Sequence, residues 1–138
     1  MTLELVLVPD SSVPIFRQIA DGLRASMARG AVGPDNRLPS VRALAESLGV
    51  NPNTVHKAFT ELEREGLVVG ERGRGMVVRD GVRRAARTAG EESVVDRLAD
   101  AVRLAQAIGV PEERFQVLLR RAQRMAGDRS AKENTHGD

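Results

Sequence analysis

Residues 40–59, SVRALAESLGVNPNTVHKAF, decide the expected fold. Ser40 can cap a first short helix, which carries apolar residues three and four positions apart and which Gly49 ends. Asn51 can cap a second helix that has Pro52 at its first position. Two short helices joined by so tight a turn indicate a helix-turn-helix. In such a unit the second helix enters the major groove of DNA with its N-terminal end first.

The first turns of that second helix carry polar side chains opposite its apolar stripe. Asn53, Thr54, His56 and Lys57 lie on this polar face. An asparagine can read adenine through two hydrogen bonds, and a threonine can contact a base or a phosphate. Capping or simple solvation remains the alternative for Asn53 and Thr54. We interpret His56 as a surface donor toward phosphate, because no partner ligand lies near it in the sequence to form a metal site.

A β-hairpin is predicted directly after these helices. Residues 67–69 and 76–78 are two short β-prone runs, and the turn between them, residues 70–75, reads GERGRG. Gly73 permits a positive φ and a close approach of the backbone to DNA. Arg72 and Arg74 can then reach the minor groove or the flanking phosphates, as the wing of a winged helix does.

The segments before the helix-turn-helix complete the predicted domain, residues 1–80. Alternating leucines over residues 3–8 predict a strand, and apolar residues every four positions over 15–27 predict an amphipathic helix. The expected order is strand, three helices, hairpin. The fold class is therefore mainly α with a small β-wing, a winged helix-turn-helix domain followed by a two-helix dimerisation segment.

The C-terminal part predicts a different organisation. Residues 81–90 read as a basic linker, residues 91–127 as an antiparallel pair of helices, and residues 128–138 as a disordered tail. So short a helical pair cannot bury both of its apolar stripes, so we expect a second copy of the chain to cover them. The candidate dimer-interface residues are Val94, Leu98, Val102, Ala105, Phe115, Leu118, Leu119 and Ala122.

Composition excludes several classes of function. The 138 residues include no cysteine and only two histidines, and hydrophobic residues make up 41%. We therefore expect no enzyme, no metal site and no cofactor. No apolar run is long enough to span a membrane, and the N-terminus does not resemble a signal peptide, so we expect a cytoplasmic protein. The net charge is +2, yet residues 72–87 hold six arginines against Asp80 alone. Such a stripe can bind a polyanion, and a solvated, arginine-rich surface is the alternative.

Five stretches of the chain together resemble the DNA-binding domain of the GntR family of bacterial winged helix-turn-helix regulators. The resemblance covers roughly residues 3–79, and the short helical segment after it is similar to the YtrA-type subfamily. The stretches are VPIFRQI at residues 13–19, RLPSVRALA at 37–45, GVNPNTV at 49–55, ELEREGL at 61–67 and RGRG at 72–75.

The resemblance implies which residues lie at or near DNA. Many relatives carry a basic residue where this chain has Pro52, and Arg or Lys at His56. For Arg42, an ion pair with Glu46 one turn along the helix is the alternative to a DNA contact. The full set of candidate DNA-binding residues is Ser40, Arg42, Asn51, Asn53, Thr54, His56, Lys57, Arg72, Gly73 and Arg74.

The expected function is sequence-specific DNA binding by a transcription regulator, most simply a homodimeric repressor on a palindromic operator. A small-molecule effector is a further candidate partner. The alternative is a winged-helix module that binds protein through the same surface. The exposed polar and basic side chains favour DNA, because a protein-binding surface would be expected to show apolar or aromatic anchors.

Overall fold

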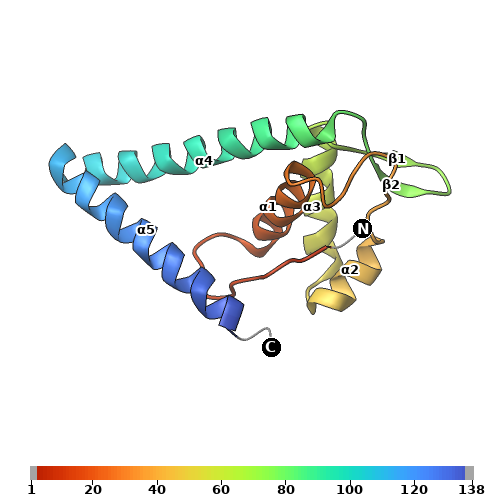
Figure 1. The fold of residues 1–138 in the computed structure, drawn as a ribbon, viewed down its shortest axis with the longest axis horizontal. Helices are drawn as coiled ribbons and strands as arrows, with labels where there is room; N and C mark the ends of the chain where they lie inside the picture. The colour runs from red at the N-terminus through yellow and green to blue at the C-terminus, as the bar shows by residue number, and fades with distance from the viewer. Residues whose placement is uncertain (1–2, 136–138) are drawn as a thin grey trace. The chain divides into compact units, whose positions relative to one another are not determined.

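A computed structural model describes residues 3–135, apart from the side chains of residues 133–135. The chain divides into two compact units, residues 1–93 and 94–138. Within residues 3–135, no helix combines the length and the apolar character that crossing a bilayer requires. The elements in chain order are α1 (Ile15–Ala28), α2 (Val41–Leu48), α3 (Pro52–Arg64), β1 (Val68–Glu71), β2 (Gly75–Val78), α4 (Val82–Ala107) and α5 (Glu112–Thr135) (Figure 1).

The first unit is built on three helices that share one core. Ile19 and Leu23 of α1 are fully buried, as are Val55 and Leu62 of α3, and Leu44 of α2 is nearly so. Ile19 and Leu23 lie four positions apart and Val55 and Leu62 seven, spacings that place each pair on one face of its helix. The apolar periodicity therefore positions α3 with one side in the core and the other in solvent.

Local capping fixes where α2 and α3 begin and end. The Ser40 hydroxyl oxygen accepts a hydrogen bond from the Ala43 N–H at 3.1 Å. The Asn51 side chain likewise accepts from the Asn53 N–H at 2.8 Å. Gly49 ends α2 with a φ of 67°, a left-handed conformation that glycine adopts without steric cost. The predicted helix-turn-helix is thus confirmed.

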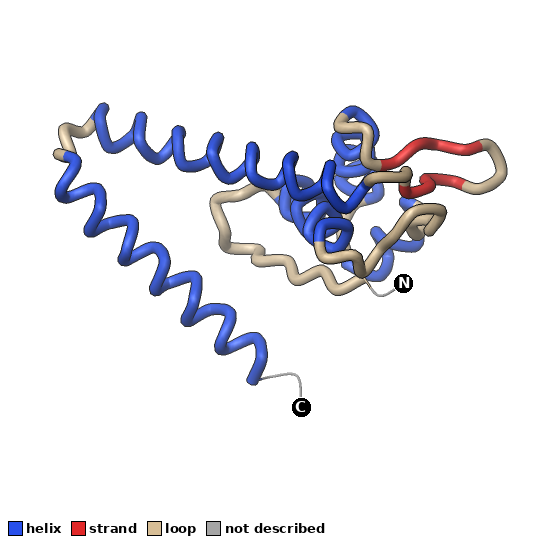
Figure 2. Tube along the Cα trace, turned by 45° about the horizontal axis from the view of Figure 1, so that its top comes forward, coloured by secondary structure: helices blue, strands red, loops and turns tan. Residues whose placement is uncertain are grey.

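The predicted hairpin is also present. Strands β1 and β2 pair antiparallel, from Val68 opposite Val78 to Glu71 opposite Gly75. The hairpin projects beyond the helices of the first unit (Figure 2). Its turn has Gly73 at a φ of 83°, so the glycine is required there. Arg37 adds a single antiparallel bridge to Val77 on the free side of β2.

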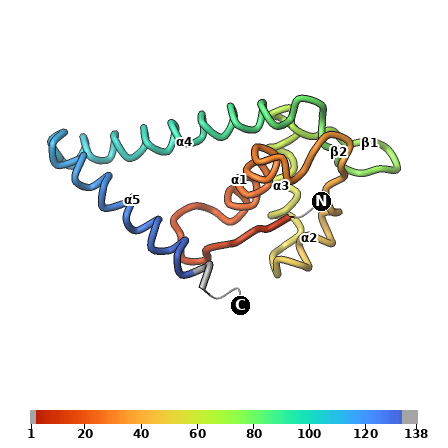
Figure 3. The backbone as a smooth tube through the Cα atoms, in the orientation of Figure 1, coloured from red at the N-terminus to blue at the C-terminus, as the bar shows by residue number. Residues whose placement is uncertain are grey.

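The strand predicted over residues 3–8 is not formed. This segment has no strand neighbour to pair with, and a strand without a partner is not stable. Its alternation is nevertheless realised, because the leucines of residues 3–7 pack against the core while Glu4 and Val6 are exposed. Gln18 of α1 holds the end of the segment in place, since its side chain accepts from the Val8 N–H at 2.8 Å and donates to the Val8 carbonyl at 3.0 Å. Figure 3 shows this N-terminal segment as a loop that leads into α1.

The linker predicted over residues 81–90 is wrong. Gly81 has a positive φ and turns the chain, and the next residue begins α4, which continues without a break to Ala107. Val82 and Ala86, one turn apart, are only 2% and 1% exposed and belong to the core of the first unit. The burial of these two residues stabilises a helix in residues 82–90, part of the segment whose basic charge and glycines had indicated a linker.

The helical pair of the second unit differs from the prediction in two ways. Helix α5 continues to Thr135, so the disordered tail predicted from residue 128 is wrong through residue 135, and residues 136–138 lie outside the described residues. Ala105 beside the turn at Gly109 is buried, whereas Val94 and Met125 are 58% and 63% exposed. The two helices therefore pack only near their turn, and not along their length as an antiparallel hairpin.

Candidate nucleic-acid interface

The solvent face of α3 carries the polar residues expected to meet DNA. Asn53, His56 and Lys57 are exposed, and Thr54 is partly buried. Shallow depressions run along this face: one is lined by Asn53, Thr54 and Lys57 together with α1, and another by Asn53, His56 and Lys57. The hydrogen-bonding groups at the N-terminal end of α3 are thus gathered on one accessible surface.

Helix α1 supports this face through two contacts that sequence analysis missed. The Lys57 ammonium lies 4.3 Å from the centre of the Phe16 ring, a cation–π distance. One turn further along α3, the Glu61 carboxylate lies 3.7 Å from the Arg17 guanidinium. The sequence feature that could have indicated this support is Phe16, an aromatic residue at the start of α1 in a chain with only three phenylalanines.

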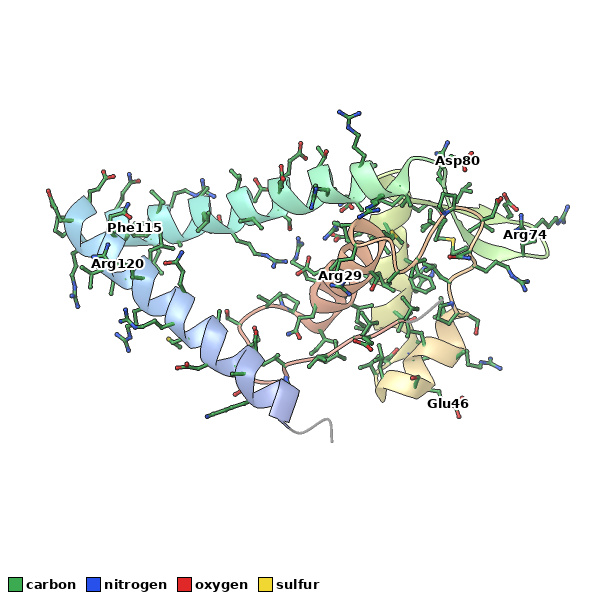
Figure 4. The ribbon with its side chains drawn as sticks, in the orientation of Figure 1. Arg29, Glu46, Arg74, Asp80, Phe115 and Arg120 are labelled. Carbon is green, nitrogen blue, oxygen red and sulfur yellow. The ribbon has the colours of Figure 1, made fainter. Side chains whose placement is uncertain are left out.

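The wing presents its own basic residues. Arg72, Gly73 and Arg74 at the turn are all exposed, and Arg74 lies at the outer part of the hairpin (Figure 4). Arg74 also forms an ion pair with Glu71 at 2.8 Å, in which both side chains are more than 40% exposed. An exposed pair of this kind is worth little, so it does not prevent Arg74 from exchanging Glu71 for a phosphate.

The start of α2 lies close to the wing. Ser40 and Arg74 line the same open groove. Arg42 is exposed, and in the described part of the chain it makes no ion pair with Glu46, so the intrahelical alternative is not realised. Asn51 is exposed too, but its side-chain oxygen is occupied in capping α3. Arg37, which was not among the predicted contacts, lines the groove as well.

An ion pair made by a buried arginine holds the end of α3 against α1. Two nitrogens of the Arg24 guanidinium donate to the two carboxylate oxygens of Glu65, at 3.0 and 2.6 Å, and a third donates to Asp21 at 3.0 Å. Arg24 is only 5% exposed. Burial by itself lowers the pKa of Arg24, but the hydrogen bonds and charges of Glu65 and Asp21 outweigh it and raise the pKa above its ordinary value. This bidentate contact fixes the C-terminal end of α3 against α1, and it therefore also fixes the orientation of the polar face of α3.

The residues predicted to form a dimer interface lie in the second unit, and several of them leave apolar surface exposed. Val94, Leu98 and Val102 of α4 are 58%, 43% and 37% exposed. Ala105 is buried, Phe115, Leu118 and Leu119 are partly buried, and Ala122 is exposed. Between residues 94 and 132, Ala105 is the only buried residue.

Comparison with known proteins places this geometry in a family. Residues 16–78 match the family model described as "Bacterial regulatory proteins, gntR family". The chain is 47% identical over 70 residues to the HTH-type transcriptional repressor YtrA of Bacillus subtilis, an alignment that covers 51% of this chain and 54% of that protein. The chain thus spans about half the length of this curated relative.

Solved structures show the same fold over more of the chain. The structure of YtrA from Sulfolobus acidocaldarius, a GntR-family transcription factor, is 37% identical with a TM-score of 0.55, and the match covers 69% of this chain and 97% of that one. A GntR family transcriptional regulator from Listeria monocytogenes is 26% identical with a TM-score of 0.58, covering 81% of this chain and 97% of that one. The chain, with its YtrA-type relatives, belongs to the GntR family of DNA-binding transcription regulators.

Proposed function

We propose that this chain is a transcription repressor that binds a palindromic DNA operator as a homodimer. The DNA-binding part of this proposal rests on one observation. The exposed polar face of α3, the start of α2 and the basic turn of the wing present hydrogen-bond donors and positive charge on adjacent surfaces. In this arrangement α3 supplies side chains for base edges in the major groove, while Arg72 and Arg74 meet phosphates or the minor groove.

The uncovered apolar surface of the second unit supports the homodimer. Val94, Leu98 and Val102 recur every four residues along α4, so they form one stripe. A helical pair whose described side chains include one buried residue cannot be stable through its own core. A second copy of the same stripe would cover it symmetrically, and a two-fold dimer would read two half-sites in inverted repeat.

The proposal is tested with the purified protein and the DNA upstream of its own gene. Binding is titrated at two salt concentrations, with a scrambled duplex of equal length as the control. We expect tight binding to the upstream fragment, with two chains per site, that survives moderate salt. Equal binding to both duplexes that vanishes as salt rises would leave only a basic surface and refute sequence-specific regulation. An effector that releases the operator would appear in the same titration as a loss of affinity on its addition.

Variants then separate base reading from phosphate contact. Replacing Asn53 by Ala should change the preference for one base pair by about 1–3 kcal/mol if the amide reads a base. Replacing Arg74 by Ala should instead weaken binding to all duplexes alike and reduce the salt slope by about one per chain, or about two for the dimer. Arg29 is an exposed residue at the C-terminal end of α1, away from the wing in Figure 4, so Arg29→Ala is the charge-matched control. Unchanged operator affinity in both Asn53→Ala and Arg74→Ala would refute the assignment of these residues.

The dimer is tested by the molar mass in solution. Leu98→Glu places a charge in the apolar stripe, and we expect it to shift the protein toward monomer and to weaken operator binding. Glu92→Ala, an exposed residue of α4 within the first unit, is the control and should remain dimeric. A wild-type protein that is monomeric at the concentrations at which it binds DNA would contradict the homodimer.

A further inference from the structure

A short segment before α2 runs beside the wing and carries an arginine that the proposed contacts do not use. The Leu38 N–H donates to the Met76 carbonyl at 2.9 Å, and the Val78 N–H donates to the Asn36 carbonyl at 2.8 Å. With the bridge between Arg37 and Val77, this segment acts as a third strand on β2. Because successive side chains of a strand alternate, burial of Leu38 leaves the Arg37 side chain exposed.

An open groove of about 630 Å³ lies between this segment, α3 and the wing. Phe59 and Leu38 are apolar residues of its lining, Arg37 and Arg74 are the two charged ones, and none of its lining residues is acidic. The two arginines come from segments that are far apart in the sequence but are joined through β2. Glu71 is the acidic residue of the hairpin, residues 68–78, and is already paired with Arg74.

We propose that this groove holds a phosphodiester of the bound duplex between Arg37 and Arg74, which makes Arg37 a DNA-contacting residue. The proposal rests on the function proposed above. If α3 occupies the major groove and the wing reaches the adjacent minor groove, the sugar–phosphate strand that separates those grooves must pass between α3 and the wing. The groove lies at that position. A guanidinium suits this ligand, because its planar set of donors matches phosphate oxygens.

Arg37 has no competing partner in residues 3–135, since no ion pair or hydrogen bond of its side chain is present there. It therefore meets a phosphate without first breaking a contact, whereas Arg74 must give up Glu71. The proposed contact of Arg37 is with the sugar–phosphate backbone of the DNA and not with a base. Losing it should weaken specific and non-specific binding by the same factor and leave base preference unchanged.

The test compares wild type with Arg37→Ala, Arg37→Lys and the control Arg29→Ala on the upstream duplex and on the scrambled duplex. We expect Arg37→Ala to lose roughly three- to tenfold in affinity per chain for both duplexes and to lower the salt slope by about 0.9 per chain, or about 1.8 for the dimer. Arg37→Lys keeps the slope, and Arg29→Ala matches wild type. Binding by the wild type tests the proposed function, and the difference between wild type and Arg37→Ala tests this inference. An unchanged affinity and slope in Arg37→Ala overturns it.

A second arm locates the phosphate. Single phosphates of the duplex are replaced in turn by neutral methylphosphonates. One position in each half-site should weaken wild-type binding and have no effect on Arg37→Ala, because the contact is already lost. If every methylphosphonate weakens binding by Arg37→Ala as much as it weakens binding by the wild type, the inference is overturned. Inorganic phosphate at matched ionic strength should compete no better than chloride, and stronger competition that Arg37→Ala removes would assign the groove to a free anion instead. Should Arg37→Ala unfold, Arg37→Gln replaces it in both arms.

Discussion

Replacing Glu65 by Gln should destabilise the first unit by about 2 kcal/mol. The substitution keeps the shape of the side chain but removes its charge and one of the two acceptors that hold Arg24. Hydrogen bonds to charged groups contribute about 1.5–3 kcal/mol each, and breaking a fully buried pair costs about 3–5 kcal/mol. Glu65 retains 25% of its side-chain exposure and Asp21 still reaches Arg24, so the lower part of that range applies.

The assay is reversible urea or thermal unfolding, followed by circular dichroism at equal protein concentrations because a dimer has a concentration-dependent Tm. A loss of about 2 kcal/mol corresponds to a fall in Tm of about 8–16 °C for a unit of about 90 residues. Since the pKa of Arg24 is raised, its charge is present at every pH below that raised value. Its contribution to stability would be lost only as the pH rises through that value, in strong alkali, so the effect should not vary around neutrality.

Glu71→Gln is the matched control, because it makes the same chemical change in an ion pair that is exposed. There the carboxylate side chain is 41% exposed and its partner Arg74 is 47% exposed, so less than about 0.5 kcal/mol should be lost. If Glu65→Gln and Glu71→Gln lower the Tm equally, the Arg24 contact contributes no more than a surface pair, and the account of how α3 is fixed against α1 is wrong.

Three further predictions, with smaller expected effects, concern α3 and the residues around it. Asn51→Ala removes the acceptor for the Asn53 N–H and should cost about 1 kcal/mol in urea unfolding. Gly49→Ala should cost about 1 kcal/mol in the same assay, from its φ of 67° alone, because an added Cβ meets nothing within 4 Å. Phe16→Leu should weaken DNA binding slightly, and its double-mutant cycle with Lys57→Met should give a coupling of about 0.5–1 kcal/mol; additive effects would mean that the ring does not position the lysine.

The parts of the fold that could be predicted are those that local chemistry determines. Ser40 and Asn51 cap helices, and Gly49 ends one, through contacts with residues no more than four positions away. The hairpin follows from a Gly-rich turn between two β-prone runs. The polar face of α3 follows from the helical period once the ends of the helix are known. For the same reason the exposed positions of the candidate DNA-binding residues were accessible from sequence.

The remaining features depend on contacts between distant segments. Val82 and Ala86 enter a core built mainly from residues before 79, so the helix at residues 82–90 cannot be inferred from that segment alone. The pairing of Arg24 with Glu65 joins residues 41 positions apart. Arg37 belongs to a fragment too short to read as a strand, and only its hydrogen bonds with β2 bring it next to the wing.

The way arginines are paired in the first unit explains how a chain with a net charge of only +2 can present a positive surface to DNA. Along the contact between α1 and α3, Arg17 and Arg24 are neutralised by carboxylates. On the surface proposed to face DNA, Arg37 and Arg42 have no such partner among the described residues. At 0.1 M salt, charges more than about 10 Å apart are largely screened, so acidic residues farther than that from this surface lower the net charge but contribute little to the field there. It is this local field, and not the net charge, that we expect to set the affinity for DNA.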